Sequence, residues 1–298
     1  MYKPMLTVMV GLSGSGKSTI ARTELADENT VIVSSDAIRE ELCGTVEDQS
    51  KNVEVFKLFH ERIRRNLEKK KNVIADATNL TMKSRRAILM TVNGLDVCKR
   101  CYIVPKPYEY CLKDNRHREH PVPDEVITKQ RMKFQVAFME EGWDIIQFDR
   151  RFIESDEYQP VFSLLVLDRM KYFDQKNPHH TLSLQDHCYK AYNEFVRKYG
   201  DQNTYVTGAL LHDWGKLFCQ TFDEDGIAHY FGHASISSYE LVVNAPNPIV
   251  LESAFLANYH MLPFDWKTEK AHEKWKKRFG EEKYNVLMEF HECDLAAR

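Results

Sequence analysis

Short apolar runs alternate with longer amphipathic segments through the first half of the chain. The runs lie at residues 6–10, 31–33, 73–75 and 101–104, and charged segments with helical spacing separate them. This alternation is typical of βαβ units, which predicts a parallel sheet with helices on its faces. Ligands bind such sheets at the carboxyl ends of the strands, so we expect functional residues at that edge.

The pattern changes after a polar stretch at residues 149–160 that contains a proline and has no apolar periodicity. Beyond it the spacing is helical, with helices expected over Gln185–Tyr199 and Tyr205–Phe218 and a short strand over Ile227–Tyr230. The polar stretch suits a linker. The sequence therefore predicts an α/β domain over residues 1–152 and a mainly α-helical domain over residues 153–298.

Length and composition agree with two soluble domains and limit the expected compartment and partners of the protein. The chain has 298 residues, more than one hydrophobic core usually holds. Of these residues 43% are hydrophobic and 29% are charged, which is typical of a soluble globular protein. No apolar run is long enough to span a bilayer and the seven cysteines are scattered, so we expect a cytoplasmic protein with reduced thiols and no membrane partner. The net charge of −3 argues against general polyanion affinity. The basic segment 99–118 is either a local nucleic-acid contact or a solvated face.

A phosphate-binding loop follows the first apolar run. Residues 11–18, GLSGSGKS, fit G-x-x-x-x-G-K-[ST] between a strand and a helix. Backbone N–H groups of such a loop bind phosphate, Lys17 would reach the outer phosphates of ATP and Ser18 would bind Mg²⁺. The predicted nucleotide-binding residues here are Gly11, Ser13, Gly14, Ser15, Gly16, Lys17, Ser18 and Thr19.

Asp36 and Arg39 follow the second apolar run, one helical turn apart. A phosphoryl-transfer enzyme gains from a carboxylate that accepts the proton of the attacking hydroxyl and from an arginine that neutralises spreading charge. The alternative is that Asp36 caps a helix and Arg39 pairs with it on the surface.

The phosphate loop, the segment Ser35-Asp36-x-x-Arg39 and residues 73–79, VIADATN, together resemble the phage and bacterial polynucleotide 5′-kinases. The resemblance implies that Asp36 is the general base toward the 5′-OH and that Arg39 holds the phosphate beside the acceptor nucleotide. Asp76 is either a residue near Mg²⁺ or a partner of the adjacent loop.

Residues 115–118, NRHR, and the segments after them are similar to the lid of the same family, in which arginines clamp the phosphates of ATP. The family often spaces two lid arginines four residues apart. Because position 120 is His here, Arg116 is expected to carry this role more than Arg118.

A second group of chemical residues lies in the helical half: His187, the doublet His212-Asp213, His233, His260 and Asp294. Imidazole and carboxylate ligands suit divalent transition metals, and two metals can activate water and stabilise a leaving oxygen. A single histidine on an apolar helix is more often a core residue. The doublet between an apolar stretch and Gly-Lys is unfavourable in a core unless a metal compensates its burial.

This half resembles the HD superfamily of phosphohydrolases, with H…HD…D at His187, His212, Asp213 and Asp294. The resemblance implies that His233 and His260 are the extra ligands of two-metal members and that Lys216 lies near the substrate phosphate. The metals expected are one or two ions of Mn, Ni, Co, Fe or Zn. His180, in a loop before His187, is either a phosphate contact or an exposed residue.

The two resemblances together predict a bifunctional end-healing enzyme. Its kinase would phosphorylate 5′-OH ends, and its HD domain would remove 2′,3′-cyclic, 2′- or 3′-phosphates, with RNA rather than DNA ends as the partner and a separate RNA ligase alongside. One alternative is a nucleoside or metabolite kinase fused to an HD nucleotidase. Another is an HD half that senses a ligand and regulates the kinase.

Overall fold

The computed structural model describes residues 3–152, 154–155, 163–176 and 182–297, and the chain divides into two compact units. The first unit comprises residues 1–130 and 141–152; the second comprises residues 131–140 and 153–298. Half of the expected linker, residue 153 and residues 156–160, lies outside the described residues, as does His180. Residues 131–140, placed in the first domain on sequence grounds, belong instead to the second unit.

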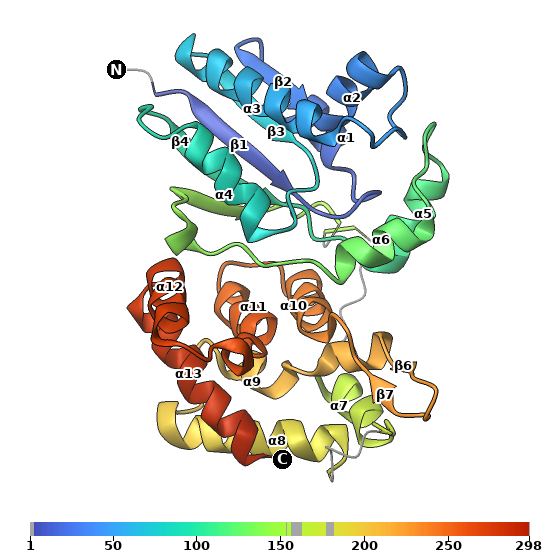
Figure 1. The fold of residues 1–298 in the computed structure, drawn as a ribbon, viewed down its shortest axis with the longest axis vertical. Helices are drawn as coiled ribbons and strands as arrows, with labels where there is room; N and C mark the ends of the chain where they lie inside the picture. Colours follow the sequence, from blue (N-terminus) through green and yellow to red (C-terminus); the bar gives the residue numbers. More distant parts are fainter. Residues whose placement is uncertain (1–2, 153, 156–162, 177–181, 298) are drawn as a thin grey trace. The chain divides into compact units, whose positions relative to one another are not determined.

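A five-stranded parallel sheet forms the centre of the first unit as described (Figure 1). The strand order is β2-β3-β1-β4-β5, and all neighbours run parallel. The strands are β1 (Met5–Val10), β2 (Thr30–Ser34), β3 (Asn72–Asp76), β4 (Cys98–Ile103) and β5 (Ile145–Phe148). Because β1 is central, the loop that follows it leaves the middle of the carboxyl edge, with β2 and β3 on one side and β4 and β5 on the other.

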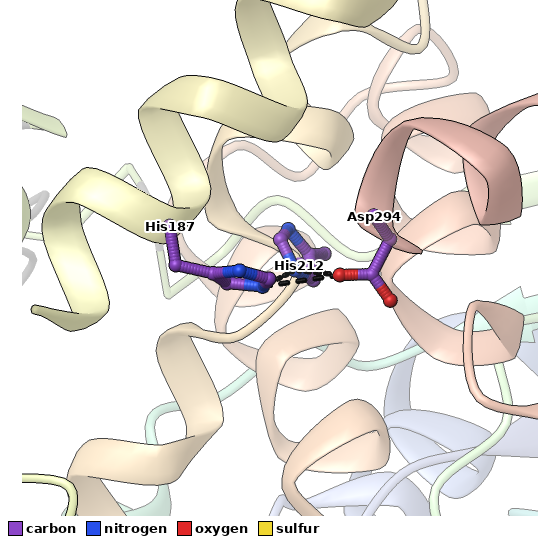
Figure 2. A group of neighbouring side chains, drawn as sticks. All are labelled: His187, His212 and Asp294. Atoms are coloured by element: carbon purple, nitrogen blue, oxygen red, sulfur yellow. Dashed lines mark hydrogen bonds and ion pairs between the residues drawn. The ribbon is translucent and has the colours of Figure 1, made fainter. Parts of the chain in front are cut away.

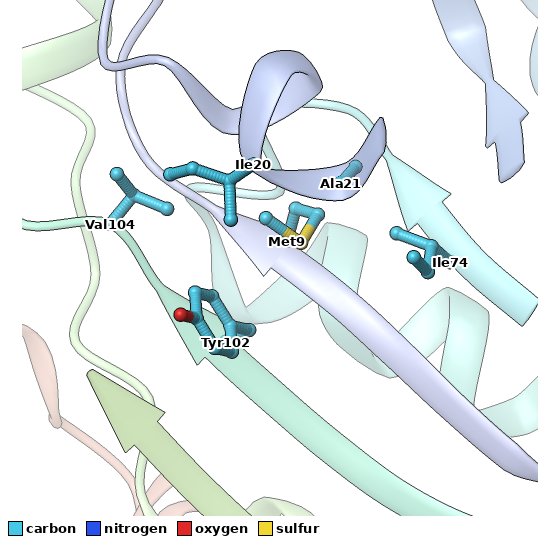
Figure 3. Packing of buried hydrophobic residues seen from close by; sticks show 6 residues of the cluster. All are labelled: Met9, Ile20, Ala21, Ile74, Tyr102 and Val104. Atoms are coloured by element: carbon cyan, nitrogen blue, oxygen red, sulfur yellow. The ribbon is translucent and has the colours of Figure 1, made fainter. Parts of the chain in front are cut away.

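Helices cover the sheet on its faces. Figure 3 shows one layer of the core, where Met9 of β1, Ile74 of β3 and Tyr102 of β4 meet Ile20 and Ala21 from the segment after the phosphate loop. The helical segments of this unit are α1 (Lys17–Ile20), the π-helical η1 (Ala21–Leu25), α2 (Ser35–Cys43), α3 (Asn52–Glu68), α4 (Met82–Thr91), α5 (Tyr108–Arg116) and α6 (Asp124–Arg131). The 3-10 helix η2 (Met139–Glu141) begins in the second unit and ends where the chain returns to the first. The core thus fixes the start of α1 against the central strands.

The second unit is a helical bundle with one small hairpin in the part that the structure describes. Its helical segments are α7 (Ser163–Lys171), α8 (Leu184–Tyr199), α9 (Val206–Leu211), η3 (Trp214–Phe218), α10 (His233–Asn244), α11 (Val250–Tyr259), η4 (Leu262–Asp265), α12 (Glu269–Phe279) and α13 (Glu281–Ala296). Every helix among the described residues is too short or too polar to cross a bilayer.

Two sequence-based expectations need correction here. The helix expected over Tyr205–Phe218 is interrupted at His212-Asp213, where α9 ends and the 3-10 helix η3 begins. The strand expected over Ile227–Tyr230 is shortened to β7 (Ala228–His229), which pairs antiparallel with β6 (Thr221–Phe222). The interruption matters for function because it lets two adjacent side chains leave the helix axis in different directions.

Residues 131–140 are held in the second unit by buried polar contacts. The Asn258 side chain accepts a hydrogen bond from the Val136 N–H at 2.8 Å and donates to the Phe134 carbonyl at 3.1 Å. Arg131 forms an ion pair with Glu240 at 2.5 Å, and both side chains are largely buried. The segment therefore belongs to the bundle because Phe134, Val136 and Phe138 are buried and the Asn258 side chain satisfies its backbone.

Candidate active site and metal centre

The phosphate loop is shaped by glycines that no other residue could replace without strain. Gly14 and Gly16 have φ of +80° and +91°, in the left-handed region. A Cβ on Gly14 would lie 2.1 Å from the carbonyl oxygen of Cys111, so α5 packs directly on the loop. The loop and the start of α1 are therefore placed where backbone N–H groups can converge on an anion.

Lys17 lies under the loop. Its Nζ donates to the Leu12 carbonyl at 2.7 Å, and burial lowers the pKa of the ammonium group, while Asp76 counteracts this effect. Ser18 hydrogen-bonds the Asp76 carboxyl, whose pKa is raised by burial. Thr19 is exposed on α1. Asp76 thus contacts the residue expected to bind Mg²⁺, which favours a role near the cation.

Gln130 is a further residue of this site that sequence reasoning missed. Its side-chain oxygen accepts a hydrogen bond from the Ser13 N–H at 2.8 Å, and its amide nitrogen donates to Ser13 Oγ at 3.0 Å. This pair of bonds joins α6 to the phosphate loop. The contact spans 117 positions along the chain, and no local motif signals it.

The structure brings Asp36, Arg39 and Arg118 together beyond the carboxyl edge. Arg39 Nη1 lies 3.1 Å from Asp36 Oδ1, and its Nη2 donates to Asn52 Oδ1 at 2.8 Å. Arg118 Nη2 is 3.9 Å from Asp36 Oδ2. The Arg39 side chain is buried, whereas that of Asp36 is 57% exposed, so the carboxylate can meet an incoming hydroxyl.

Arg116 is placed differently. Its side chain is 64% exposed and pairs with Asp124 Oδ2 at 2.6 Å. The side chain of Asn115, just before Arg116, bonds both the carbonyl and the N–H of Val122, and this pair of bonds holds the loop that carries Arg118. The structure therefore places Arg118 beside Asp36 and Arg116 beside Asp124, while the expectation that Arg116 clamps the phosphates of ATP stays a prediction.

In the second unit the predicted metal residues converge. Figure 2 shows His187 of α8, His212 at the end of α9 and Asp294 of α13 pointing toward one another. Asp294 Oδ1 lies 3.0 Å from His187 Nε2 and 3.6 Å from His212 Nε2. Asp213, His233 and His260 form an adjoining group.

The four imidazoles share one hydrogen-bonding arrangement. Each directs Nδ1 at a backbone carbonyl, and the pairs are His187 with Ala297, His212 with Ala209, His233 with Tyr230, and His260 with Ala257, at 2.8–3.3 Å. A carbonyl only accepts, so each Nδ1 must carry the proton and each Nε2 of a neutral ring presents a lone pair. This is the tautomer that metal-binding histidines adopt.

Asp213 lies between the two groups. Its Oδ2 is 3.6 Å from Nε2 of both His187 and His212, and its Oδ1 is 3.2 Å from Nε2 of His233 and 3.5 Å from that of His260. Each carboxylate oxygen thus faces a different pair of histidines. The geometry is that of a carboxylate able to bridge two cations.

The electrostatics of this centre favour a positive charge within it. Burial would raise the pKa of Asp213, but Lys216 and His212 hold it well below the usual value. Burial would likewise raise the pKa of Asp294, but hydrogen bonds with imidazoles keep it far below its usual value. Burial lowers the pKa of His260. Two carboxylate anions therefore lie in one buried space, with the Lys216 ammonium group beside one of them.

Three observations show that these residues fit a divalent transition metal. The Nε2 atoms of His187 and His212 are 3.2 Å apart, as are those of His233 and His260, so lone pairs face each other unless a cation or proton lies between them. Asp213 Oδ1 is buried and receives no hydrogen bond within the described chain. Burial alone would lower the pKa of His212, yet the Asp213 and Asp294 carboxylates raise it well above its usual value, so the surroundings attract positive charge.

Lys216 and Cys188 complete the surroundings. Lys216 Nζ lies 2.7 Å from Asp213 Oδ2 and donates to Gln175 Oε1 at 3.2 Å. Cys188, which sequence reasoning did not single out, is near His212 and Asp213, but burial raises the pKa of its thiol. A protonated thiol is a poor ligand, so the histidines and carboxylates are the better donor set.

Comparison with known proteins assigns the class of the first unit. Residues 6–137 match a family model described as an AAA domain. The chain is similar to the L-seryl-tRNA(Sec) kinase of Methanococcus maripaludis, at 27% identity over 164 residues, which cover 53% of this chain and 64% of the relative. It is also similar to the bifunctional polynucleotide phosphatase/kinase of Schizosaccharomyces pombe, at 24% identity over 147 residues, or 48% of this chain and 32% of the relative.

Among solved structures, the Pnkp1/Rnl/Hen1 RNA repair complex is similar at 27% identity with a TM-score of 0.40, covering 44% of this chain and 43% of the other. The chain spans less than two thirds of the length of each curated relative above. The first unit is a P-loop kinase-like α/β domain, homologous to these kinases, which confirms the predicted parallel sheet with flanking helices. The second unit is helical, as expected.

Proposed function

We propose that this chain is a bifunctional enzyme that heals nucleic-acid ends. Its first unit would transfer the γ-phosphoryl group of ATP to a 5′-OH end, and its second would remove 2′,3′-cyclic, 2′- or 3′-phosphates as an HD-type phosphohydrolase. The observation that carries the kinase half is the exposed Asp36 carboxylate flanked by Arg39 and Arg118 at the edge where the phosphate loop leaves the sheet.

For the kinase, Asp36 would accept the proton of the attacking hydroxyl, while Arg39 and Arg118 would neutralise charge on the phosphates. Lys17 and the loop N–H groups would hold the outer phosphates of ATP. Ser18 and Asp76 are the residues that would hold Mg²⁺. When bound, this cation would stabilise negative charge on the transferred phosphoryl group. Asp36 is suited to its role because its side chain reaches solvent while its arginine partners remain partly or fully buried.

The names of the two relatives support a nucleic-acid acceptor. One is a kinase of seryl-tRNA and the other a polynucleotide phosphatase/kinase. Both names describe kinases whose substrate contains a nucleic acid, which favours this substrate class over a free metabolite. RNA is the proposed substrate, and joining of the healed ends would fall to a separate ligase.

For the hydrolase, His187, His212 and Asp294 would hold one metal, His233 and His260 a second, and Asp213 would contact both. Divalent metals in such a site activate water and stabilise a leaving oxygen. Lys216 would contribute a positive charge next to the substrate phosphate, since its Nζ already lies beside Asp213.

Transfer of labelled γ-phosphate from ATP to a 5′-OH oligonucleotide, run beside nucleosides and sugars, tests the kinase half. Asp36→Asn should lower this transfer by about 10²–10⁴-fold and leave release of phosphate from 2′- and 3′-phosphate ends unchanged. Asp213→Asn should do the reverse. Labelling of small molecules alone would point to a metabolite kinase.

The same variants distinguish a sensor from an enzyme in the second unit. A ligand-sensing HD domain would release no phosphate from any end with Mn, Ni, Co, Fe or Zn supplied, and its Asp213→Asn variant would change the kinase rate. Loss of both activities in either variant, with the fold intact, would contradict two independent sites.

A further inference from the structure

Helix α12 and the residues just before it form a basic surface, here defined as residues 267–278. It contains six basic side chains and two acidic ones, in a chain whose net charge is −3. The basic members are Lys267, Lys270, Lys274, Lys276, Lys277 and Arg278. This segment therefore carries a local excess of positive charge, although the chain as a whole has a net negative charge.

Most of these lysines are not neutralised by the protein. Lys276 pairs with Glu281 at 2.7 Å, but within the described part of the chain Lys267, Lys270, Lys274 and Lys277 form no ion pair and are exposed. A solvated helical face usually mixes charges of both signs, as α3 does where Arg64 pairs with Glu68. Four of the six basic side chains of this surface have no such ion pair within the described chain, so a local positive field extends into solvent.

An aromatic side chain lies among these cations. Trp275 is half-buried, and its ring centroid is 5.5 Å from Lys274 Nζ and 5.0 Å from Arg278 Cζ. It stacks on Trp266 with the ring centroids 5.9 Å apart, and Trp266 in turn stacks on Tyr284. The indole is thus held rigidly while part of it reaches solvent beside two positive charges.

From this arrangement we propose that the basic surface binds the single-stranded body of a nucleic acid, RNA if the proposed end-healing function holds. Lysines that track phosphates, with an aromatic ring on which a base can stack, are the features of sequence-independent single-strand binding. A lipid surface fits less well, because none of the large apolar side chains exposed in the described chain belongs to α12 and Phe279 is fully buried.

The surface belongs to the same unit as the metal centre. Helix α12 leads through Gly280 into α13, which carries Asp294 near its other end. A nucleic acid whose body lies along α12 would gain affinity without contacting the reacting end. Binding and turnover can therefore be separated experimentally.

The test compares Lys270/Lys274/Lys277→Gln with a control, Lys57/Lys69/Lys71→Gln, which removes three exposed lysines from α3 and the turn after it. Affinity of the full-length proteins for a labelled single-stranded uridine oligomer is measured by fluorescence anisotropy over a range of salt. Loss of three phosphate contacts should reduce the salt slope by about 2 and weaken binding roughly a hundredfold at about 0.1 M salt. The control should bind like the natural protein.

A second variant, Trp275→Phe, keeps a ring in the stack and should abolish the quenching of tryptophan emission by the oligomer. Unchanged affinity and salt slope in the triple variant would overturn the proposal, as would equal loss in the control. The proposal would also be overturned if the triple variant lost binding to phosphatidylserine vesicles but kept its affinity for the oligomer, because the surface would then bind lipid. Phosphorylation of a 5′-OH dinucleotide should be unaffected, and its absence in the natural protein would count against the kinase proposal without touching this one.

Discussion

Replacement of Gly215 by alanine should disturb one half of the metal centre while leaving the other. A Cβ at this position would lie 2.1 Å from the His233 carbonyl oxygen and 2.9 Å from the Ser237 backbone nitrogen. Both atoms are backbone atoms of α10, so no side chain can turn aside. The start of α10 must therefore move away from η3, and His233 must move with it.

The expected cost follows from two contributions. Overpacking of a close helix contact destabilises a protein by about 1–3 kcal/mol. The Gly215 N–H also donates to Ser237 Oγ at 2.7 Å in a fully buried setting, and loss of that bond would add about 1–3 kcal/mol. The free energy of unfolding should fall by about 2–6 kcal/mol, and His233 Nε2 should withdraw from Asp213 Oδ1, from which it is now 3.2 Å distant.

Metal content per chain, thermal unfolding and release of phosphate from 3′-phosphate ends would be measured together. Gly215→Ala should lower all three. Ser237→Ala is the matched control, because it removes the same hydrogen bond without the clash, so stability should fall while metal content stays the same. A Gly215→Ala protein with unchanged metal content and unfolding temperature would refute the link between this close approach and the position of His233.

Three further predictions concern the separate sites. Arg118→Ala should lower kcat/KM for phosphoryl transfer by about two orders of magnitude, whereas Arg116→Ala removes an exposed ion pair with Asp124 and should change it less than about fivefold; equal losses would return Arg116 to the site. Burial raises the pKa of Asp76, so the stability that its neutral form gives is lost as pH rises through that raised pKa. Asp76→Asn should therefore raise the unfolding temperature at neutral pH but not in acid, and a shift equal at both would contradict this. Chelation of a metal present at about 100 times its Kd should destabilise the second unit by about 2.7 kcal/mol, measured by thermal unfolding with and without chelator, and re-addition of metal should restore it.

The fold of the first unit could be predicted because its determinants are local. A motif that needs a strand before it and a helix after it fixes β1 and α1, and the spacing of apolar runs gives the neighbouring strands. The contribution of residues 131–140 could not be predicted. Apolar residues alternate at positions 132, 134, 136 and 138, but this pattern does not say which core buries them. Their place depends on Asn258, more than 120 positions away, which bonds their backbone.

The candidate sites divide in the same way. His212-Asp213 stands out because two groups that resist burial adjoin an apolar run, and the structure places both at the break between α9 and η3. Spacing favours Arg116 for the phosphates of ATP, and that role stays a prediction. Which arginine lies beside Asp36 depends instead on the turn after α5, where Asn115 binds Val122 and Asp124 pairs with Arg116. A pattern of residue types cannot specify which of two nearby arginines a folded loop turns inward.

The histidine carbonyl contacts give the strongest physical reason to regard the second unit as a metal site. A satisfied core histidine donates one nitrogen and finds a donor for the other, whereas here the Nε2 atoms of His233 and His260 face each other and an anionic oxygen of Asp213. Burying acceptors against acceptors is unfavourable by several kcal/mol unless a metal cation or a proton lies between them. Selection for stability alone would favour apolar side chains at this point, so the arrangement supports the proposal that the second unit holds a cation.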